Sequence, residues 1–390
     1  MNLVDELSAY RDDMARWRHD IHQHPETAYE EARTADLVAR ELETFGMDIV
    51  RGLGKTGVVA TLRKGQANRA IALRADMDAL NLQELNEFDY RSVNDGKMHA
   101  CGHDGHTAML LGAAKYLAEE GGFDGTVYFI FQPAEEGGHG AKAMIEDGLF
   151  TQFPCEQVFG MHNMPGFEAN TFAVRKGPLM AAADVARVTL RGVGGHGAFP
   201  HLTRDPVIAG ARLVEAWNGV VSRRVNPLES AVVSVTQFKA SDAVNVIPDT
   251  VTIAASVRSL TTATRRILDE ALGEAAHGVA AAHGMTADYE FELGDCATVN
   301  SDEETDLCAQ VAAKLVGPER VQTNIAPLMG SEDFGWMLAE KPGCYLFLGN
   351  GIGQTGGCMV HNPHYDFNDD ILVTGAAYWV ELARAALPNR

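Results

Sequence analysis

Residues 98–106 gather one thiol, three imidazoles and one carboxylate in a single short segment. Cys101 and His103 are two residues apart, so in an extended segment their side chains leave the same face of the backbone. A thiolate and a neutral imidazole together are ligands for first-row transition metals, most often zinc. Apolar residues at helical spacing follow directly, so the pattern predicts a metal-binding turn that leads into a helix. Alone, the segment is also compatible with an exposed histidine-rich loop, and only further ligands can decide between the two.

Two adjacent carboxylates, Glu135 and Glu136, follow an almost entirely apolar segment at residues 126–132. Neighbouring side chains point in different directions, so one glutamate can bind a metal while the other stays free. A free glutamate beside a metal-activated water is what metal-assisted hydrolysis requires, because the carboxylate takes a proton from the water and returns it to the leaving group. An isolated pair is more often two solvated glutamates in a loop, so this interpretation also depends on nearby ligands.

Two further histidines follow other predicted elements. His162 ends a predicted strand at residues 157–161, and His361 follows a predicted glycine-rich turn at residues 349–353. A lone histidine in such a place is more often structural than a ligand. Taken together, however, the residues of ligand type at these loop positions are Cys101, His103, Glu136, His162 and His361. Five such ligands suffice for two metal ions that share a bridging ligand and each keep an open position.

The elements that must position these residues alternate between apolar strands and helices. Strands are expected at residues 57–63, 70–75, 126–132, 157–161 and 344–348. This alternation predicts an α/β catalytic domain with a mixed, mainly parallel sheet that is covered on both faces. Such sheets carry function at the carboxyl ends of their strands. Asp76 and Asp78 follow one strand, Glu135 and Glu136 another and His162 a third, so we expect these candidates to share one edge of the sheet.

The pattern changes between residues 184 and 295. Strands are expected there at residues 185–191, 231–238, 250–257 and 286–291. Two helices lie between them, the first with Asp205 as its expected N-cap and Pro206 at its first position. The resulting order, β-α-β-β-α-β, is that of a small ferredoxin-like sandwich. We therefore expect residues 1–183 and 296–390 to form the catalytic domain, with residues 184–295 inserted as a smaller domain.

Composition excludes several classes of protein. The net charge of -21 argues against nucleic acid or an anionic membrane surface as a partner. No run approaches the ~20 apolar residues that a membrane-spanning helix needs. The six cysteines contain no Cys-x-x-Cys pair, so we expect neither a disulfide framework nor a zinc knuckle, and we expect those other than Cys101 to be core or loop thiols. The acidic, helix-patterned N-terminus is unlike a secretory signal, so the expected location is the cytoplasm. His19, His22 and His24 are expected to be surface or capping groups.

The series of motifs along the chain resembles the aminoacylase/carboxypeptidase superfamily of di-metal amidohydrolases. Within it, the chain is most similar to the branch of hippurate hydrolases, N-acetyl-amino-acid deacetylases and indoleacetyl-amino-acid hydrolases. The resemblance covers essentially the whole chain, and its motifs contain His24, Asp76, Asp78, Cys101, His103, Glu135, His196, Asn245, Ser331 and His361. So many motifs in one order make the resemblance specific.

The resemblance implies a role for each matching position. The residues that match the family's metal ligands are Cys101, His103, Glu136, His162 and His361. Cys101 stands where relatives use a bridging aspartate. Glu135 matches the general acid and base, and Asp78 matches the carboxylate that orients the metal site from behind its ligands. The implied cofactor is two divalent metal ions per subunit, zinc or manganese in the first place and cobalt or nickel as alternatives.

The inserted domain of family members acts as a lid and mediates dimerisation, which implies a homodimer here. His196 matches the lid histidine that helps to hold the scissile carbonyl oxygen. Asn245 and Arg258 match lid residues that bind the substrate carboxylate, and the fork of donors on an arginine suits that role.

The implied reaction is cleavage of an N-acyl amino acid, with an acetyl, benzoyl or similar acyl group, to a carboxylic acid and a free amino acid. A dipeptidase or carboxypeptidase is the alternative with the same site, since a peptide bond is also an amide. Two other classes stay open: a thiol enzyme with Cys101 as nucleophile, and a non-catalytic metal-binding protein. Chelators and alkylating agents separate the first from a metalloenzyme, and the intact Glu135 argues against the second.

Overall fold

The computed structural model describes residues 3–389 and divides into two compact units. The first unit comprises Met1–Gly177, Val299–Ala326 and Asp333–Arg390, and the second comprises Pro178–Thr298 and Pro327–Glu332. Each unit has a hydrophobic core of its own. The first unit is discontinuous in sequence, because the chain leaves it for the second unit and later returns.

The first unit is built, within the described residues, on an eight-stranded sheet with the strand order β1-β2-β4-β3-β5-β16-β6-β15. The strands are β1 (Asp48–Leu53), β2 (Gly57–Lys64), β3 (Ala70–Asp76), β4 (Gly125–Gln132), β5 (Gln157–Pro165), β6 (Phe172–Ala173), β15 (Val321–Gln322) and β16 (Gly343–Gly351). The neighbours β4, β3, β5 and β16 run parallel, whereas β1, β2 and β4 pair antiparallel at one end and β6 is antiparallel to β16. This confirms the predicted mixed, mainly parallel sheet.

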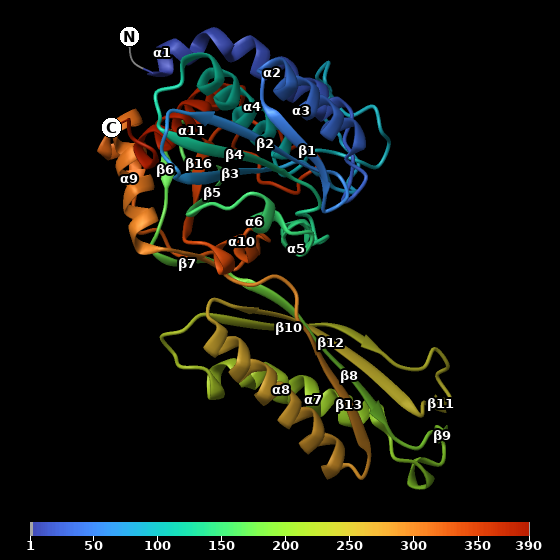
Figure 1. Ribbon diagram of the computed structural model, residues 1–390. Helices are drawn as coiled ribbons and strands as arrows, with labels where there is room; N and C mark the ends of the chain where they lie inside the picture. The colour runs from blue at the N-terminus through green and yellow to red at the C-terminus, as the bar shows by residue number, and fades with distance from the viewer. Residues whose placement is uncertain (1–2, 390) are drawn as a thin grey trace. The chain divides into compact units, whose positions relative to one another are not determined.

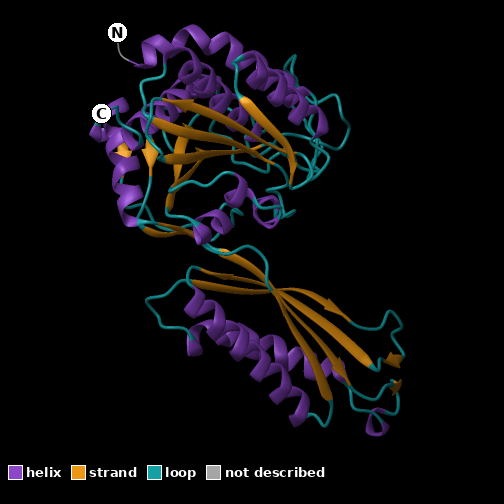
Figure 2. Cartoon of the chain, viewed as in Figure 1, coloured by secondary structure: helices purple, strands orange, loops and turns teal. Residues whose placement is uncertain are grey.

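Helices cover this sheet, and every residue of β3 and β16 is buried. The helices are α1 (Leu3–Leu7), α2 (Arg11–Gln23), α3 (Ala32–Thr44), α4 (His103–Glu120), α5 (Gly140–Glu146), α6 (Leu149–Gln152), α9 (Asp302–Val316), α10 (Gly335–Glu340) and α11 (Leu372–Ala386). Figure 1 shows α2 and α3 on one side of the strands and α5 and α10 on the other, and Figure 2 shows the same layers by type of element. The described part of the chain contains no helix long and apolar enough to cross a membrane.

The carboxyl ends of the parallel strands meet at one edge of the sheet. Asp76 is the last residue of β3 and pairs in register with Gln132, the last residue of β4. His162 lies near the end of β5, beside β16. The loops that follow these strands therefore gather their side chains at this edge. β16 itself continues to Gly351, so part of the turn predicted at residues 349–353 is strand.

The second unit has the element order β-α-β-β-α-β. Its elements are β8 (Ala182–Arg191), α7 (Pro206–Arg224), β10 (Ala231–Lys239), β12 (Thr250–Ser259), α8 (Thr262–Ala282) and β13 (Thr286–Glu292). The four strands form an antiparallel sheet in the order β10-β12-β8-β13. The carboxylate of Asp205 accepts a hydrogen bond from the N–H of Val207 at 2.8 Å, which confirms it as the N-cap of α7. Short strands β9 (Gly195–His196) and β11 (Val246–Ile247) pair with each other in the loops.

Replacement of Trp217 by alanine should destabilise the second unit by about 3–5 kcal/mol, the usual cost of truncating a large buried aromatic residue. Trp217 on α7 is fully buried, and its indole N–H donates to the carbonyl of Leu272 on α8 at 3.0 Å. Hydrogen exchange of the amides in β8 and β12 would measure the loss of local stability. The matched control is Ile208→Ala, on the same helix but 55% exposed, which should change stability by less than about 0.5 kcal/mol. Equal exchange rates in the two variants would contradict the prediction.

Candidate metal centre

The loop before α4 presents two candidate ligands on either side of one glycine. Gly102 has a φ of +97°, a backbone conformation that residues with a side chain rarely adopt, and it directly precedes α4. It separates Cys101 from His103, the first residue of the helix, and both side chains are buried. The Sγ atom of Cys101 lies 3.3 Å from Nε2 of His162 on β5. The turn thus brings the first two candidates against the third.

Two groups of ligand-type atoms share Cys101. Cys101, His103 and His162 form one group, which is fully buried. Cys101, Glu136 and His361 form the other, and within each group the ligand atoms lie within 4.8 Å of one another. The Nε2 atom of His361 lies 3.2 Å from Oε1 of Glu136, and its backbone N–H donates to the carbonyl that precedes Cys101 at 2.7 Å. The structure therefore brings together all five residues that the sequence singles out as ligand candidates.

A strained turn after β4 presents the two adjacent glutamates. Ala134 in this turn has a φ of +55°, and its N–H donates to the buried carboxylate of Glu31 at 2.9 Å. The N–H of Glu136 donates to Oδ2 of Asp78 at 2.9 Å. Buried carboxylates that follow other elements thus fix the backbone from which Glu135 and Glu136 project.

Glu135 and Glu136 differ in their neighbours. Each has a carboxylate oxygen 4.0 Å from Nε2 of His103. Only Glu136 also belongs to the group with Cys101 and His361. The geometry therefore favours Glu136 as the ligand and places Glu135 beside the cluster, in reach of a group bound there.

Hydrogen bonds orient the two imidazoles of the buried group. The Nδ1 atom of His103 donates to the carbonyl of Asp78 at 2.8 Å and lies 3.3 Å from its Oδ1 atom. The Nδ1 atom of His162 donates to the carbonyl of Asn163 at 2.5 Å. Because Nδ1 of each ring faces a carbonyl oxygen, Nε2 is the atom that each ring directs toward the cluster, as a metal ligand requires.

One buried nitrogen of the cluster lacks a hydrogen-bond partner among the described residues, which fits a bound cation. Nε2 of His103 is buried and makes no hydrogen bond within the described residues. The carboxylate oxygens around it are those of Asp76 at 3.7 Å and of Glu135 and Glu136 at 4.0 Å. These separations are too long for hydrogen bonds but suit atoms that share an ion, since metal–nitrogen and metal–oxygen bonds are each about 2 Å long.

The charge balance of the cluster also fits a cation. Burial and the nearby glutamates raise the pKa of the Cys101 thiol well above its usual value. Burial alone would lower the pKa of His103, but the carboxylates of Asp76 and Asp78 outweigh it and raise that pKa to about 10. The carboxylates thus favour a proton on His103, and burial with the glutamates favours the neutral thiol of Cys101. A divalent ion would supply positive charge to these groups, so the residues present fit a metal centre.

A neighbouring cluster of Asp76, His103 and His106 is already engaged in internal contacts. Asp76 accepts from Arg74 at 2.8 Å, and its other oxygen lies 2.6 Å from Nδ1 of His106. Nε2 of His106 lies 2.8 Å from Oδ1 of Asn163. Both ring nitrogens of His106 are therefore used to hold β3 and β5 together.

The expectation that His22 is a surface or capping group is wrong. His22 is fully buried, with Nδ1 2.8 Å from Asp104 and Nε2 3.2 Å from Glu84. Arg18 is also fully buried and pairs with Asp104 at 3.3 Å. Their spacing could have revealed this, because Arg18 and His22 are four residues apart on the same face of α2 as the buried Met14. These charged contacts anchor the first turn of α4, which carries His103.

The three residues that the sequence assigns to the inserted domain all lie in the second unit. His196 on β9 is exposed and pairs with Val246 on β11. The carbonyl of Asn245, the residue before Val246, accepts a hydrogen bond from the N–H of Gly197 at 2.8 Å. His196 and Asn245 are thus neighbours. Arg258 lies near the far end of β12, eight residues beyond the start of that strand, or about 25 Å away. The structure therefore brings His196 and Asn245 together but does not bring Arg258 to them within this unit.

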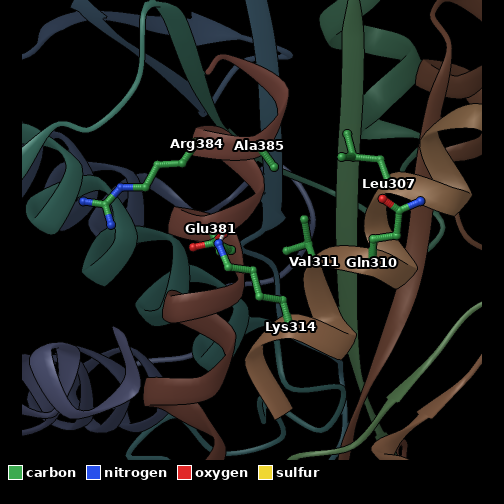
Figure 3. A pocket seen from close by; sticks show the side chains of 7 residues that line it. All are labelled: Leu307, Gln310, Val311, Lys314, Glu381, Arg384 and Ala385. Atoms are coloured by element: carbon green, nitrogen blue, oxygen red, sulfur yellow. Dashed lines mark hydrogen bonds and ion pairs between the residues drawn. The ribbon is translucent and has the colours of Figure 1, made fainter. Parts of the chain in front are cut away.

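Surface hollows of two kinds occur in the first unit. Figure 3 shows a groove of about 490 Å³ along α9 and α11, lined by Leu307, Gln310, Val311, Lys314, Glu381, Arg384 and Ala385. None of these residues belongs to a ligand group among the described residues. A smaller hollow of about 160 Å³ is lined in part by Glu136 and Asn81, so it adjoins the candidate metal centre. Cys155, Cys308 and Cys344 are buried free thiols outside the cluster.

The fold and the cluster define a class of protein: an α/β protein whose central sheet carries a group of metal-ligand side chains at the carboxyl ends of its strands. Comparison with known proteins gives the family. The model of peptidase family M20/M25/M40 matches residues 72–385, and the chain belongs to this family. The resemblance drawn from the motifs is confirmed.

Individual relatives match along almost their whole length. The hippurate hydrolase of Campylobacter jejuni is 44% identical over 383 residues, which cover 98% of this chain and 99% of the relative. The crystal structure of a protein from methicillin-resistant Staphylococcus aureus matches with a TM-score of 0.93 and 32% identity, over 99% of both chains. A dinuclear metal-binding peptidase of family M20 from Bacillus subtilis matches with a TM-score of 0.84 and 32% identity, over 97% of this chain and 99% of the other. These matches confirm the expected branch of the family and its mixed α/β fold.

Proposed function

We propose that the protein is a metal-dependent amidohydrolase that cleaves N-acyl amino acids to a carboxylic acid and a free amino acid. The observation that carries this proposal is the presence of Cys101 in both ligand groups, with Glu135 4.0 Å from His103. Two adjoining groups that share one thiol suit two metal ions, and a carboxylate beside them suits proton transfer. The similarity to a hippurate hydrolase supports the substrate class, because hippurate is an N-acyl amino acid, and the similarity to a dinuclear metal-binding peptidase supports two ions.

The residues of the chain would divide the work of hydrolysis among them. When bound, the divalent ions polarise the amide carbonyl and acidify the attacking water. Glu135 takes one proton from that water while the water oxygen bonds to the carbonyl carbon. It then returns the proton to the amide nitrogen as the carbon–nitrogen bond breaks. Asp78 fixes both the ring of His103 and the backbone of Glu136, so the ligands are oriented before substrate arrives.

For the metal we propose zinc or manganese, with cobalt and nickel as alternatives. A thiolate with three imidazoles favours zinc, whereas the carboxylate of Glu136 also suits manganese. Metal analysis of the purified protein would decide among them.

For the second unit we propose a ferredoxin-like lid and dimerisation domain over residues 184–295, in a cytoplasmic homodimer. Its β-α-β-β-α-β order supports this, as does the position of β10 at an edge of the sheet, where another strand could pair. His196 would hold the scissile carbonyl oxygen, and Asn245 and Arg258 would bind the substrate carboxylate. Arg258 lies about 25 Å along β12 from Thr250, the end of that strand that follows Asn245 in the chain, which favours a shared site, since one small substrate could contact both ends only if two subunits contributed them.

A dipeptidase or carboxypeptidase is the second candidate, favoured by the peptidases in the family. Metal-replete protein assayed against N-acetyl amino acids, N-benzoyl amino acids and dipeptides should show the higher kcat/KM on the N-acyl substrates. Chelation should abolish this activity and added zinc or manganese should restore it, because the ligand groups hold the reacting centre. Faster cleavage of dipeptides would favour the second candidate. Activity that survives chelation but not alkylation of Cys101 would establish a thiol enzyme instead.

A further inference from the structure

Gly102, which joins Cys101 to His103, packs against two buried side chains that are hydrogen-bonded to each other and are not ligand candidates. The Nδ2 atom of Asn163 donates to the hydroxyl of Tyr365 at 2.5 Å, and both residues are fully buried. A Cβ atom on Gly102 would lie 2.2 Å from Oδ1 of Asn163 and 2.5 Å from the hydroxyl of Tyr365. Only a residue without a side chain can approach this closely, so the loop is seated directly on the Asn163–Tyr365 pair.

The same pair is tied to the other histidines of the centre. The carbonyl of Asn163 accepts the Nδ1 proton of His162, which sets the direction of that ring. Tyr365 lies four residues after His361 in the same loop. The backbone N–H of His361 donates to the carbonyl of Ala100, the residue before Cys101. The pair therefore connects β5, the loop before α4 and the loop near the C-terminus, which carry four of the five ligand candidates.

We propose that Asn163 and Tyr365 are positioning residues that set the spacing between the two ligand groups. The inference rests on the proposed function, because it assumes that these groups bind metal. The loss of the Tyr365 hydroxyl would leave the buried amide of Asn163 without its acceptor and free the Gly102 turn to shift. Since Cys101 belongs to both groups, a shift of this turn would weaken the binding of both ions.

Titration of the metal-free protein with Co²⁺ in competition with a chelator tests the proposal. We expect Tyr365→Phe to raise the dissociation constant of at least one ion by about 10–100-fold, as is typical when a residue that supports a ligand is lost. The absorption band from Cys101 to cobalt should also change in position or strength. The matched control is Tyr378→Phe, a fully buried tyrosine of α11 outside the ligand groups, which should bind Co²⁺ as the unaltered protein does.

Three further results would decide the matter. If the unaltered protein binds no cobalt, the proposed function fails. If it binds cobalt and Tyr365→Phe binds it equally well with the same spectrum, the positioning role is wrong, whatever the melting temperature of the metal-free variant. If the two residues act as a unit, Asn163→Ala combined with Tyr365→Phe should weaken binding by much less than the product of the two single effects. Independent effects that multiply fully would contradict the proposal.

Discussion

Glu135→Gln should lower kcat by about 10²–10⁴-fold, the range that general acid–base catalysis contributes, while metal content stays unchanged. Glutamine keeps the shape of the side chain but cannot take a proton from water. Metal content should persist because Glu135 belongs to neither of the two groups that contain Cys101, although it forms a third group with His103 and Glu136. Steady-state kinetics on an N-acyl amino acid and metal analysis of the same preparation would measure both quantities.

Two variants serve as controls for this result. Glu146→Gln alters a carboxylate on α5 whose side chain is 68% exposed, and it should leave activity and metal content unchanged. Glu136→Gln should lose metal as well as activity, since Glu136 lies 3.2 Å from the ring of His361. If Glu135→Gln lost metal and Glu136→Gln kept it, the roles of the two glutamates would have to be exchanged. Full activity of Glu135→Gln would remove it from the mechanism.

Cys101→Ser should lower the amount of bound metal more than any other single replacement in the loop before α4. A neutral hydroxyl is a poor substitute for a thiolate, and Cys101 belongs to both ligand groups, so one change weakens both. The loss of affinity should exceed the roughly 10–100-fold expected for residues that only support a ligand. Metal analysis after dialysis and the Co²⁺ titration described above would measure it.

Cys155→Ser is the matched control, because Cys155 is also a buried free thiol but lies outside the cluster. It should keep its metal and its activity. A Cys101→Ser variant that retained metal and yet lost activity would have a different meaning. In that case the thiol would act as a nucleophile, and the metalloenzyme mechanism would need revision.

The sheet could be predicted because its strands are long and apolar. The strands expected at residues 70–75 and 126–132 appear as β3 and β4 with nearly the same bounds. β1 gave no comparable signal, because it is an exposed edge strand with a glycine near its end and no apolar alternation. Short strands such as β6 owe their existence to pairing with β16, a contact made far along the chain that local sequence does not encode.

The candidate ligands could be predicted because few residue types bind metal and all five follow strands or turns. The contacts that hold them could not, since they join segments that are distant in the sequence. Asn163 and Tyr365, for example, are 202 residues apart and meet only in the folded unit. The burial of His22 depends in the same way on Asp104. The roles of His196, Asn245 and Arg258 stay predictions.

The position of β16 between β5 and β6 has a consequence for synthesis on the ribosome. β5 is complete at Pro165, but β16 begins only at Gly343, after the whole second unit has been made. At about 5–20 residues per second, the partial sheet waits roughly 10–40 s for its missing strand. During that time the apolar edge of β5 has no partner from its own chain, and such edges pair readily with other chains. The nascent chain is therefore most open to pairing with other chains at β5 until residues 343–351 have emerged.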